Sequence, residues 1–115
     1  MSKQALEQLD ALRELLAKVE AGDATMPDIH ESMGRDGLNA TTAYNGSLDA
    51  AKALHEAVLT SIDPQYGYLV GPQYAGIAHP SCGVVCDAQS ETPARAWLIA
   101  ILKALVATTS DGGEQ

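Results

Sequence analysis

The sequence contains no phenylalanine and a single tryptophan, Trp97, and aromatic residues make up only 4% of it. Its hydrophobic core must therefore come from leucine, isoleucine, valine and alanine, with a contribution from four tyrosines. Basic residues are also scarce, because seven Lys and Arg stand against fifteen Asp and Glu, for a net charge of −8. Binding to a nucleic-acid polymer or an anionic membrane needs clustered cations, so this balance argues against both.

Cysteines and long apolar runs are scarce as well. Two cysteines do not make a disulfide framework. The longest apolar run, at 96–107, falls short of the roughly 18–20 residues that a membrane span needs. Residues 1–10 are polar with a helical pattern, unlike a signal peptide. We therefore expect a cytoplasmic protein with no membrane association, built as a single domain over 1–115 with a frayed tail at 108–115.

The stretch from Thr92 to Ala107 is the feature around which we expect the fold to be organised. Only Arg95 and Lys103 interrupt its apolar residues. Thr92 suits an N-cap, and Pro93 suits the first helical position, where a missing N–H costs nothing. A helix that is apolar nearly all round is usually the buried centre of a domain. The pattern predicts a central helix over 93–107.

Three further helices are predicted ahead of this one. Apolar residues spaced four and three apart predict a helix over 3–20, and a second long helix over 47–60 begins at a Gly-Ser cap. A short helix near 27–33 begins at a proline. His55 lies on or beside the inward face of the second long helix. That face is predicted to consist of Leu48, Ala51, Leu54, Val58, Leu59 and Ile62.

The remaining segments are predicted to be extended or irregular. Gly and Pro turns divide residues 66–87 into three short strands of a small antiparallel sheet. Gly and Asn followed by two threonines predict a loop and a short extended piece over 35–43. The predicted fold class is α+β, with the strands covered by the central helix.

His79, Cys82 and Cys86 form the one cluster of metal-ligand residue types, followed directly by Asp87. Zinc takes four such ligands in a tetrahedron, so another histidine or Asp87 would have to complete the set. Paired C-x-x-C knuckles are absent. We expect no metal and two reduced, buried thiols, and a zinc-dependent small hydrolase using His79 and Cys82 stays an alternative.

Catalytic motifs do not emerge from the sequence. Nucleophilic catalysis needs a serine or cysteine beside a base and an oxyanion hole. The chain contains no G-x-S-x-G, phosphate-binding loop or H-E-x-x-H. We therefore predict a protein that is not an enzyme, with no catalytic residues and no cofactor.

Four tyrosines lie in or next to the predicted sheet, where they supply either a binding patch or the aromatic packing that the chain otherwise lacks. Arg95 lies in the first turn of the last helix, whose free amide groups also favour an anion. An anionic ligand would need such cations beside stacking rings. The candidate ligand-binding residues are Arg95, Tyr66, Tyr68, Tyr44 and Arg35.

Two segments, A-Y-N-G-S-L-D-A-A-K-A-L at 43–54 and T-P-A-R-A-W-L-I-A-I-L-K-A-L at 92–105, together resemble small uncharacterised proteins of phages and prophages, mostly of alphaproteobacteria. The helix at 12–21 and the short helix ending in glycine at 29–34 match the same group. Many members carry a tryptophan-rich strand where this chain has Tyr66-Gly67-Tyr68. The resemblance implies a phage origin and a small α+β fold, and it carries over no catalytic residues.

These expectations combine into a function. We predict a non-enzymatic, phage-encoded binding protein that acts in the host cytoplasm by counter-defence, either sequestering a host nucleotide signal or covering a host defence protein. A homo-oligomer is expected, and the nucleotide version predicts that cations and tyrosines converge on a pocket. A structural or assembly protein that forms a small oligomer is the alternative from a different class.

Overall fold

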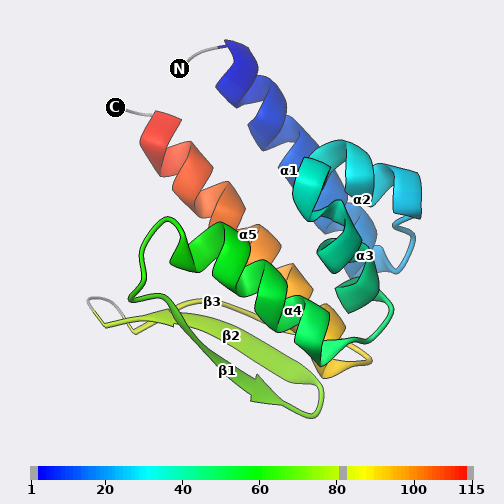
Figure 1. Ribbon diagram of the computed structural model, residues 1–115. Helices are drawn as coiled ribbons and strands as arrows, with labels where there is room; N and C mark the ends of the chain where they lie inside the picture. The colour runs from blue at the N-terminus through cyan, green and yellow to red at the C-terminus, as the bar shows by residue number, and fades with distance from the viewer. Residues whose placement is uncertain (1–2, 81–82, 114–115) are drawn as a thin grey trace.

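The computed structural model describes residues 3–80 and 83–113, with side chains over 7–80 and 86–107, and confirms the α+β class (Figure 1). A 3₁₀ turn, Gly34–Asp36, and a π-helical turn, Glu56–Thr60, extend two of the helices. The helices are α1 (Lys3–Ala21), α2 (Met26–Met33), α3 (Gly37–Tyr44), α4 (Leu48–His55) and α5 (Pro93–Gly113). The strands are β1 (Gly67–Gly71), β2 (Tyr74–His79) and β3 (Gly83–Gln89).

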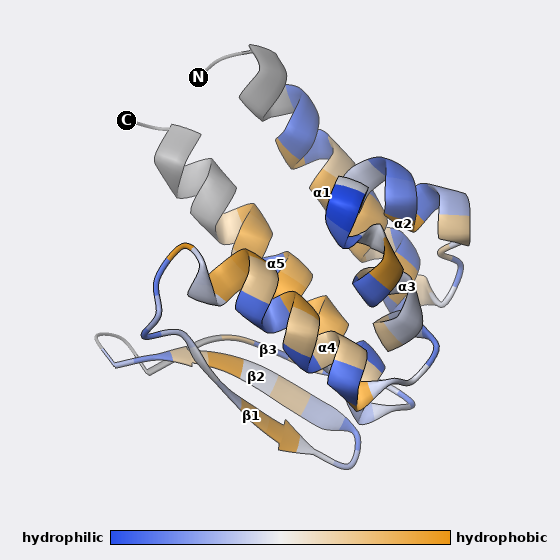
Figure 2. Cartoon of the chain, viewed as in Figure 1, coloured by the Kyte–Doolittle hydropathy of each residue, from blue (hydrophilic) through white to orange (hydrophobic). Residues whose placement is uncertain are grey.

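Helix α5 is the centre of the fold, as its sequence predicts. Every residue from Ala96 to Leu102 is buried, so all sides of the helix are covered. Helix α1 packs along one side of α5, and strands β2 and β3 lie against another side. Helices α3 and α4 also pack against α5 (Figure 2). The predicted N-cap is confirmed, because the Thr92 hydroxyl accepts a hydrogen bond from the Arg95 backbone N–H at 3.1 Å. The helix continues past the expected end at residue 107, and the frayed tail over 108–115 stays a prediction.

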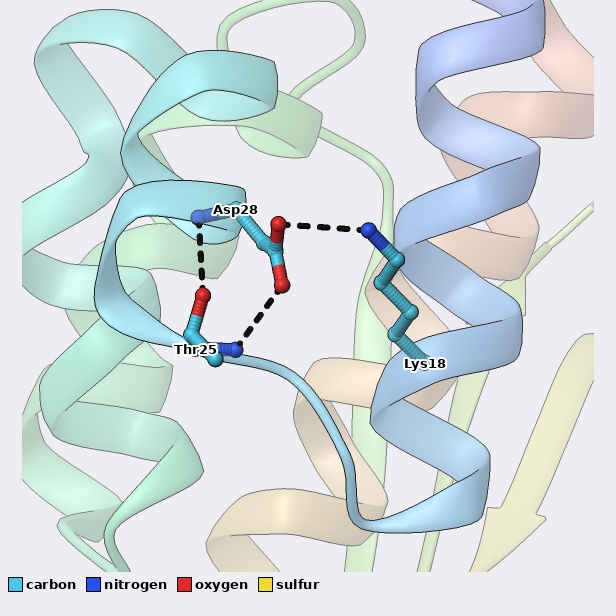
Figure 3. A network of polar contacts seen from close by, with 3 residues as sticks. All are labelled: Lys18, Thr25 and Asp28. Carbon is cyan, nitrogen blue, oxygen red and sulfur yellow. Dashed lines mark hydrogen bonds and ion pairs between the residues drawn. The ribbon is translucent and has the colours of Figure 1, made fainter.

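A capping box fixes the start of α2 and ties it to α1. The Thr25 hydroxyl accepts from the Asp28 N–H at 3.3 Å, and the Asp28 carboxylate accepts from the Thr25 N–H at 3.1 Å. Lys18 of α1 reaches the same carboxylate at 3.2 Å (Figure 3). These contacts with Thr25 and Lys18 lower the pKa of the Asp28 carboxyl. The helix predicted near 27–33 is confirmed, with its cap two residues before Pro27.

The prediction of a loop and extended piece over 35–43 is wrong, because these residues form the 3₁₀ turn and α3. Gly37, Asn39 and two threonines are poor helix formers, which is why the local pattern indicated otherwise. Burial overrides that propensity: Ala40, Thr41 and Ala43 are enclosed where α3 packs on α2, α4 and α5. Tertiary packing commonly outweighs weak local preferences of this kind.

The predicted inward face of the second long helix is correct in its middle and wrong at its two ends. Ala51, Leu54 and Leu59 are buried, whereas Leu48 and Ile62 are exposed. The π-helical turn at Glu56–Thr60 widens the helix and shifts the residues that follow around its axis. Ile62, placed by an α-helical count, therefore turns away from the core.

The sheet has the order β1-β2-β3 with both pairs antiparallel, as predicted for 66–87. Ala75 and Ile77 of β2 are fully buried and face the helices. Their directly paired neighbours share that face, and these are Val70 and Tyr68 on β1 and Ala88 and Cys86 on β3. Among residues 3–80 and 83–113, all helices lie on this one side of the sheet (Figure 1).

The opposite side, here called the outward face, carries the alternate residues. Leu69, Gly76 and Asp87 form one row across the three strands, and Gly71, Tyr74 and Gln89 form the next. Gly67 and Ala78 continue the face toward the other end of the sheet. Within the described part of the chain, no helix is both long and apolar enough to cross a membrane.

Candidate functional site

Arg95 and Tyr44, two of the predicted ligand-binding residues, lie together where α3 meets the start of α5. The Arg95 guanidinium stacks 4.1 Å above the centre of the Tyr44 ring, and its Nε donates to the Tyr44 carbonyl at 3.1 Å. Its Nη1 lies 3.9 Å from the carboxylate of Glu91, whose side chain is largely exposed. This arginine joins two helix ends, so a ligand would share it with contacts that stabilise the fold.

Tyr66 and Tyr68 belong to a different group, here called the aromatic cluster, which consists of His55, Tyr66, Tyr68, His79 and Trp97. The Tyr68 ring lies 4.4 Å from Trp97 and 5.1 Å from His55, measured between ring centres. Tyr66 packs edge-on against His79 at 5.2 Å. These spacings are those of favourable aromatic pairs. The cluster fills the space between α4, α5 and β1.

His55 is the most enclosed polar member of the aromatic cluster. Its side chain is buried, and its Nε2 lies 3.3 Å from the Tyr66 carbonyl. Burial lowers the pKa of His55 below its usual 6.5, because the low-dielectric surroundings disfavour the imidazolium. His55 Nδ1 and Trp97 Nε1 are buried without a hydrogen-bond partner from the described protein atoms. The sequence placed His55 on or beside the apolar face of its helix, and the structure confirms this.

His79 and Asp63 form a hydrogen-bonded pair that spacing in the sequence did not reveal. His79 Nε2 lies 2.8 Å from the Asp63 carboxylate, across sixteen positions of sequence. The pKa of Asp63 is lowered by a hydrogen bond from the Gln65 backbone N–H and by the bond with His79. A carboxylate that orients a histidine can support a general base. A nucleophile beside this pair would be needed for catalysis. Among the described residues, the serine closest in sequence to Asp63 is Ser61, and its hydroxyl donates to the Ala57 carbonyl one helical turn earlier.

The five predicted ligand-binding residues therefore occupy three places. Arg95 and Tyr44 form one pair, and Tyr66 and Tyr68 lie in the aromatic cluster. Arg35 is exposed in the 3₁₀ turn after α2. The chain thus brings the residues together in pairs and does not gather them around one pocket.

The alternative zinc site rests on His79, Cys82 and Cys86, of which Cys82 lies outside the described residues. Cys86 faces the helices opposite Ile77, and burial raises the pKa of its thiol, which favours the protonated form over a thiolate ligand. Among the residues that the structure describes, no three His, Cys, Asp or Glu side chains are grouped to hold a metal ion.

A surface hollow of about 460 Å³ lies where β2 begins and β3 ends. It falls within the size range of small-molecule sites, although its lining is mostly polar. Tyr74 also covers Gly76 on the outward face, because a Cβ at Gly76 would lie 3.0 Å from the Tyr74 hydroxyl. The hollow is lined by Gln73, Tyr74, Gln89, Ser90 and Glu91.

Comparison of the chain with protein-family models, with curated proteins and with solved structures finds no match.

Proposed function

We propose that this chain is a non-enzymatic binding protein that covers a partner protein with the outward face of its sheet. The observation that carries the proposal is the makeup of that face. An antiparallel sheet with helices on one side usually presents alternating polar residues to solvent on the other. Here the outward positions of β1 are Gly67, Leu69 and Gly71, and Leu69 is 56% exposed.

The central strand continues the same surface. Its outward residues are Tyr74, Gly76 and Ala78, and Tyr74 lies low across Gly76. Polar side chains reach this face from β3, through Asp87 and Gln89. A mostly uncharged face with an exposed leucine and a tyrosine suits contact with a folded protein, because interface cores are depleted of charge and enriched in tyrosine.

The charge distribution favours a protein partner over an anionic ligand on this face. The chain has no Asp, Glu, Lys or Arg between Asp63 and Asp87, so β1 and β2 supply no lysine or arginine to a phosphate. Arg95 is engaged with Tyr44. In the phage setting suggested by the sequence resemblance, the proposed role is counter-defence by covering a host defence protein.

Site-specific photo-crosslinking tests this function. A photoreactive amino acid at Asp87 or Gln89, both exposed on β3, should capture one partner of constant mass in the native cells. The same group at Glu14, exposed on α1, is the matched control and should not capture that partner. The proposal fails if neither β3 position yields an adduct, or if Glu14 yields the same one.

A nucleotide ligand is the second candidate, and the surface hollow favours it. Tyr74 offers a ring, and Gln73 and Gln89 offer amides that could pair with a base. Glu91, which also lines the hollow, has its carboxylate 3.9 Å from Arg95 Nη1. A cyclic or linear nucleotide that binds there should raise the melting temperature of the native protein, and Gln89→Ala should reduce the rise. No shift across the panel would exclude this version and leave the protein-covering proposal standing.

A further inference from the structure

The two edges of the sheet differ in how they are protected against pairing with another strand. Edge strand β3 has an irregular register with β2 near Ile77 and Ala78, and it carries the charged Asp87. The Lys103 ammonium also donates to the Asp87 carbonyl at 3.0 Å. Bulges, charges and lysines are the usual means by which proteins keep an edge strand from pairing. The β3 edge has all three.

Strand β1 has none of these protections. Its five residues pair with β2 one for one, without a register shift, and contain neither a charge nor a proline. Tyr68, Leu69 and Val70 are all exposed. Because β1 is an edge strand of the sheet, the backbone groups on its outer side are available to another strand. Figure 2 shows apolar colouring in the part of β1 near its arrowhead.

We propose that β1 pairs with β1 of a second copy of this chain, antiparallel and about a twofold axis at Leu69. A twofold interface must be self-complementary, because the same surface occurs on both sides. The sequence of β1, Gly-Tyr-Leu-Val-Gly, meets this condition. When two copies of β1 pair antiparallel about this axis, Leu69 of one copy lies opposite Leu69 of the other. Tyr68 then lies opposite Val70, and Gly67 lies opposite Gly71.

Each pairing in this register is compatible with a stable sheet. An aromatic residue opposite a β-branched one is a favourable cross-strand pair, and no like charges oppose each other. The absence of charge matters because two copies of a −8 chain repel each other over most of their surface. The result is a continuous sheet of two three-stranded halves, joined edge to edge. This pairing uses the edge of β1 and does not depend on what covers the outward face.

Solution mass measurements on a lysine variant test the proposal. The wild-type chain of 12.0 kDa should have the mass of a dimer by light scattering at micromolar concentration. Leu69→Lys would place two ammonium groups opposite each other and should weaken dimerisation by at least about tenfold. Leu38→Lys on α3, where the leucine is 69% exposed, is the matched control and should remain dimeric. A cooperative thermal transition of Leu69→Lys would show that the monomer is folded, and the dimeric control should melt at a higher temperature because association stabilises the native state.

A cysteine at the twofold axis tests the register directly. Leu69→Cys should form a disulfide-linked dimer under mild oxidation, since directly opposed Cβ atoms lie about 4.5–5.5 Å apart. Wild type, which contains both native cysteines, and Leu38→Cys should not form it. A monomeric wild type, a dimer that Leu69→Lys leaves intact, or no linkage through position 69 would each overturn the proposal. Photo-crosslinking from Asp87 or Gln89 with Leu69 unchanged separates this failure from failure of the proposed function, because Leu69 also lies on the outward face.

Discussion

Gly37 is a glycine whose role follows from its neighbour and not from its own backbone. Its φ of −61° is ordinary for a helix, so any residue could adopt it. A Cβ at this position, however, would lie 2.5 Å from His30 Nδ1 and 3.0 Å from the His30 Cα. The side chain of His30 could move, but its backbone belongs to α2. The glycine therefore sets how closely α2 and α3 approach.

Gly37→Ala should lower the free energy of unfolding by about 1–3 kcal/mol, as overpacking of a closed contact does. Chemical denaturation measures this directly. Gly67→Ala is the control, because nothing lies within 4 Å of its Cβ position. It should change stability by less than about 1 kcal/mol. Equal losses for the two variants would contradict a steric role for Gly37.

His55 should make stability depend on pH. Its pKa is lowered by burial in the folded state, so below the unfolded value of 6.5 the unfolded chain takes up a proton that the folded chain resists. The stability contribution is therefore present above pH 6.5 and is lost as pH falls toward the folded pKa. The slope from one such group reaches at most about 1.4 kcal/mol per pH unit.

Denaturation of wild type and His55→Gln between pH 7.5 and 5 checks this, with about half-unit steps resolving the slope. The wild type should lose stability more steeply than the variant over this range. If the two curves run parallel, His55 does not contribute to the pH dependence.

At the scale of elements, the cap of α2 makes a local prediction. Thr25→Ala removes the hydroxyl that accepts from the Asp28 N–H and should cost about 1 kcal/mol. Lys18→Ala removes only the partly exposed ion pair with Asp28, so its cost should be a small fraction of that. Thermal unfolding of the two variants compares them. A larger loss for Lys18→Ala would show that the link to α1, and not the cap, holds α2 in place.

The elements also show which features could be predicted from the sequence. Helix α5 and its start at Thr92 and Pro93 follow from an apolar run with a local capping signal. Helix α3 could not be predicted in the same way, because its residues become helical through burial of Ala40 and Ala43 by other elements.

The candidate site likewise contains features that the sequence predicts and contacts that it does not. Tyrosine content near the strands predicted either a binding patch or aromatic packing, and Tyr66 and Tyr68 do join one aromatic cluster. The bond between His79 and Asp63 and the stacking of Arg95 on Tyr44 connect residues far apart in the chain. No periodicity records such contacts, so only the folded arrangement reveals them.

At the scale of the whole molecule, the net charge of −8 predicts how the proposed dimer responds to salt. Added salt screens the electrostatic repulsion between two acidic copies. It does not weaken the proposed β1 interface, because β1 contains no charged residue. Raising NaCl from about 0.05 to about 0.5 M should therefore tighten the dimer several-fold. Sedimentation measurements across this range test it. A dimer that weakens with salt would indicate an interface made of ion pairs and not of β1.

The difference between the two sheet edges has a consequence for growth of the assembly. A sheet that can pair at both of its edge strands would add copies without limit and form a fibre. In this chain the irregular register of β3 and the lysine at its Asp87 carbonyl obstruct the second edge. Pairing through β1 uses up the open edge of each copy, so the assembly closes after two chains and remains a discrete particle instead of a polymer.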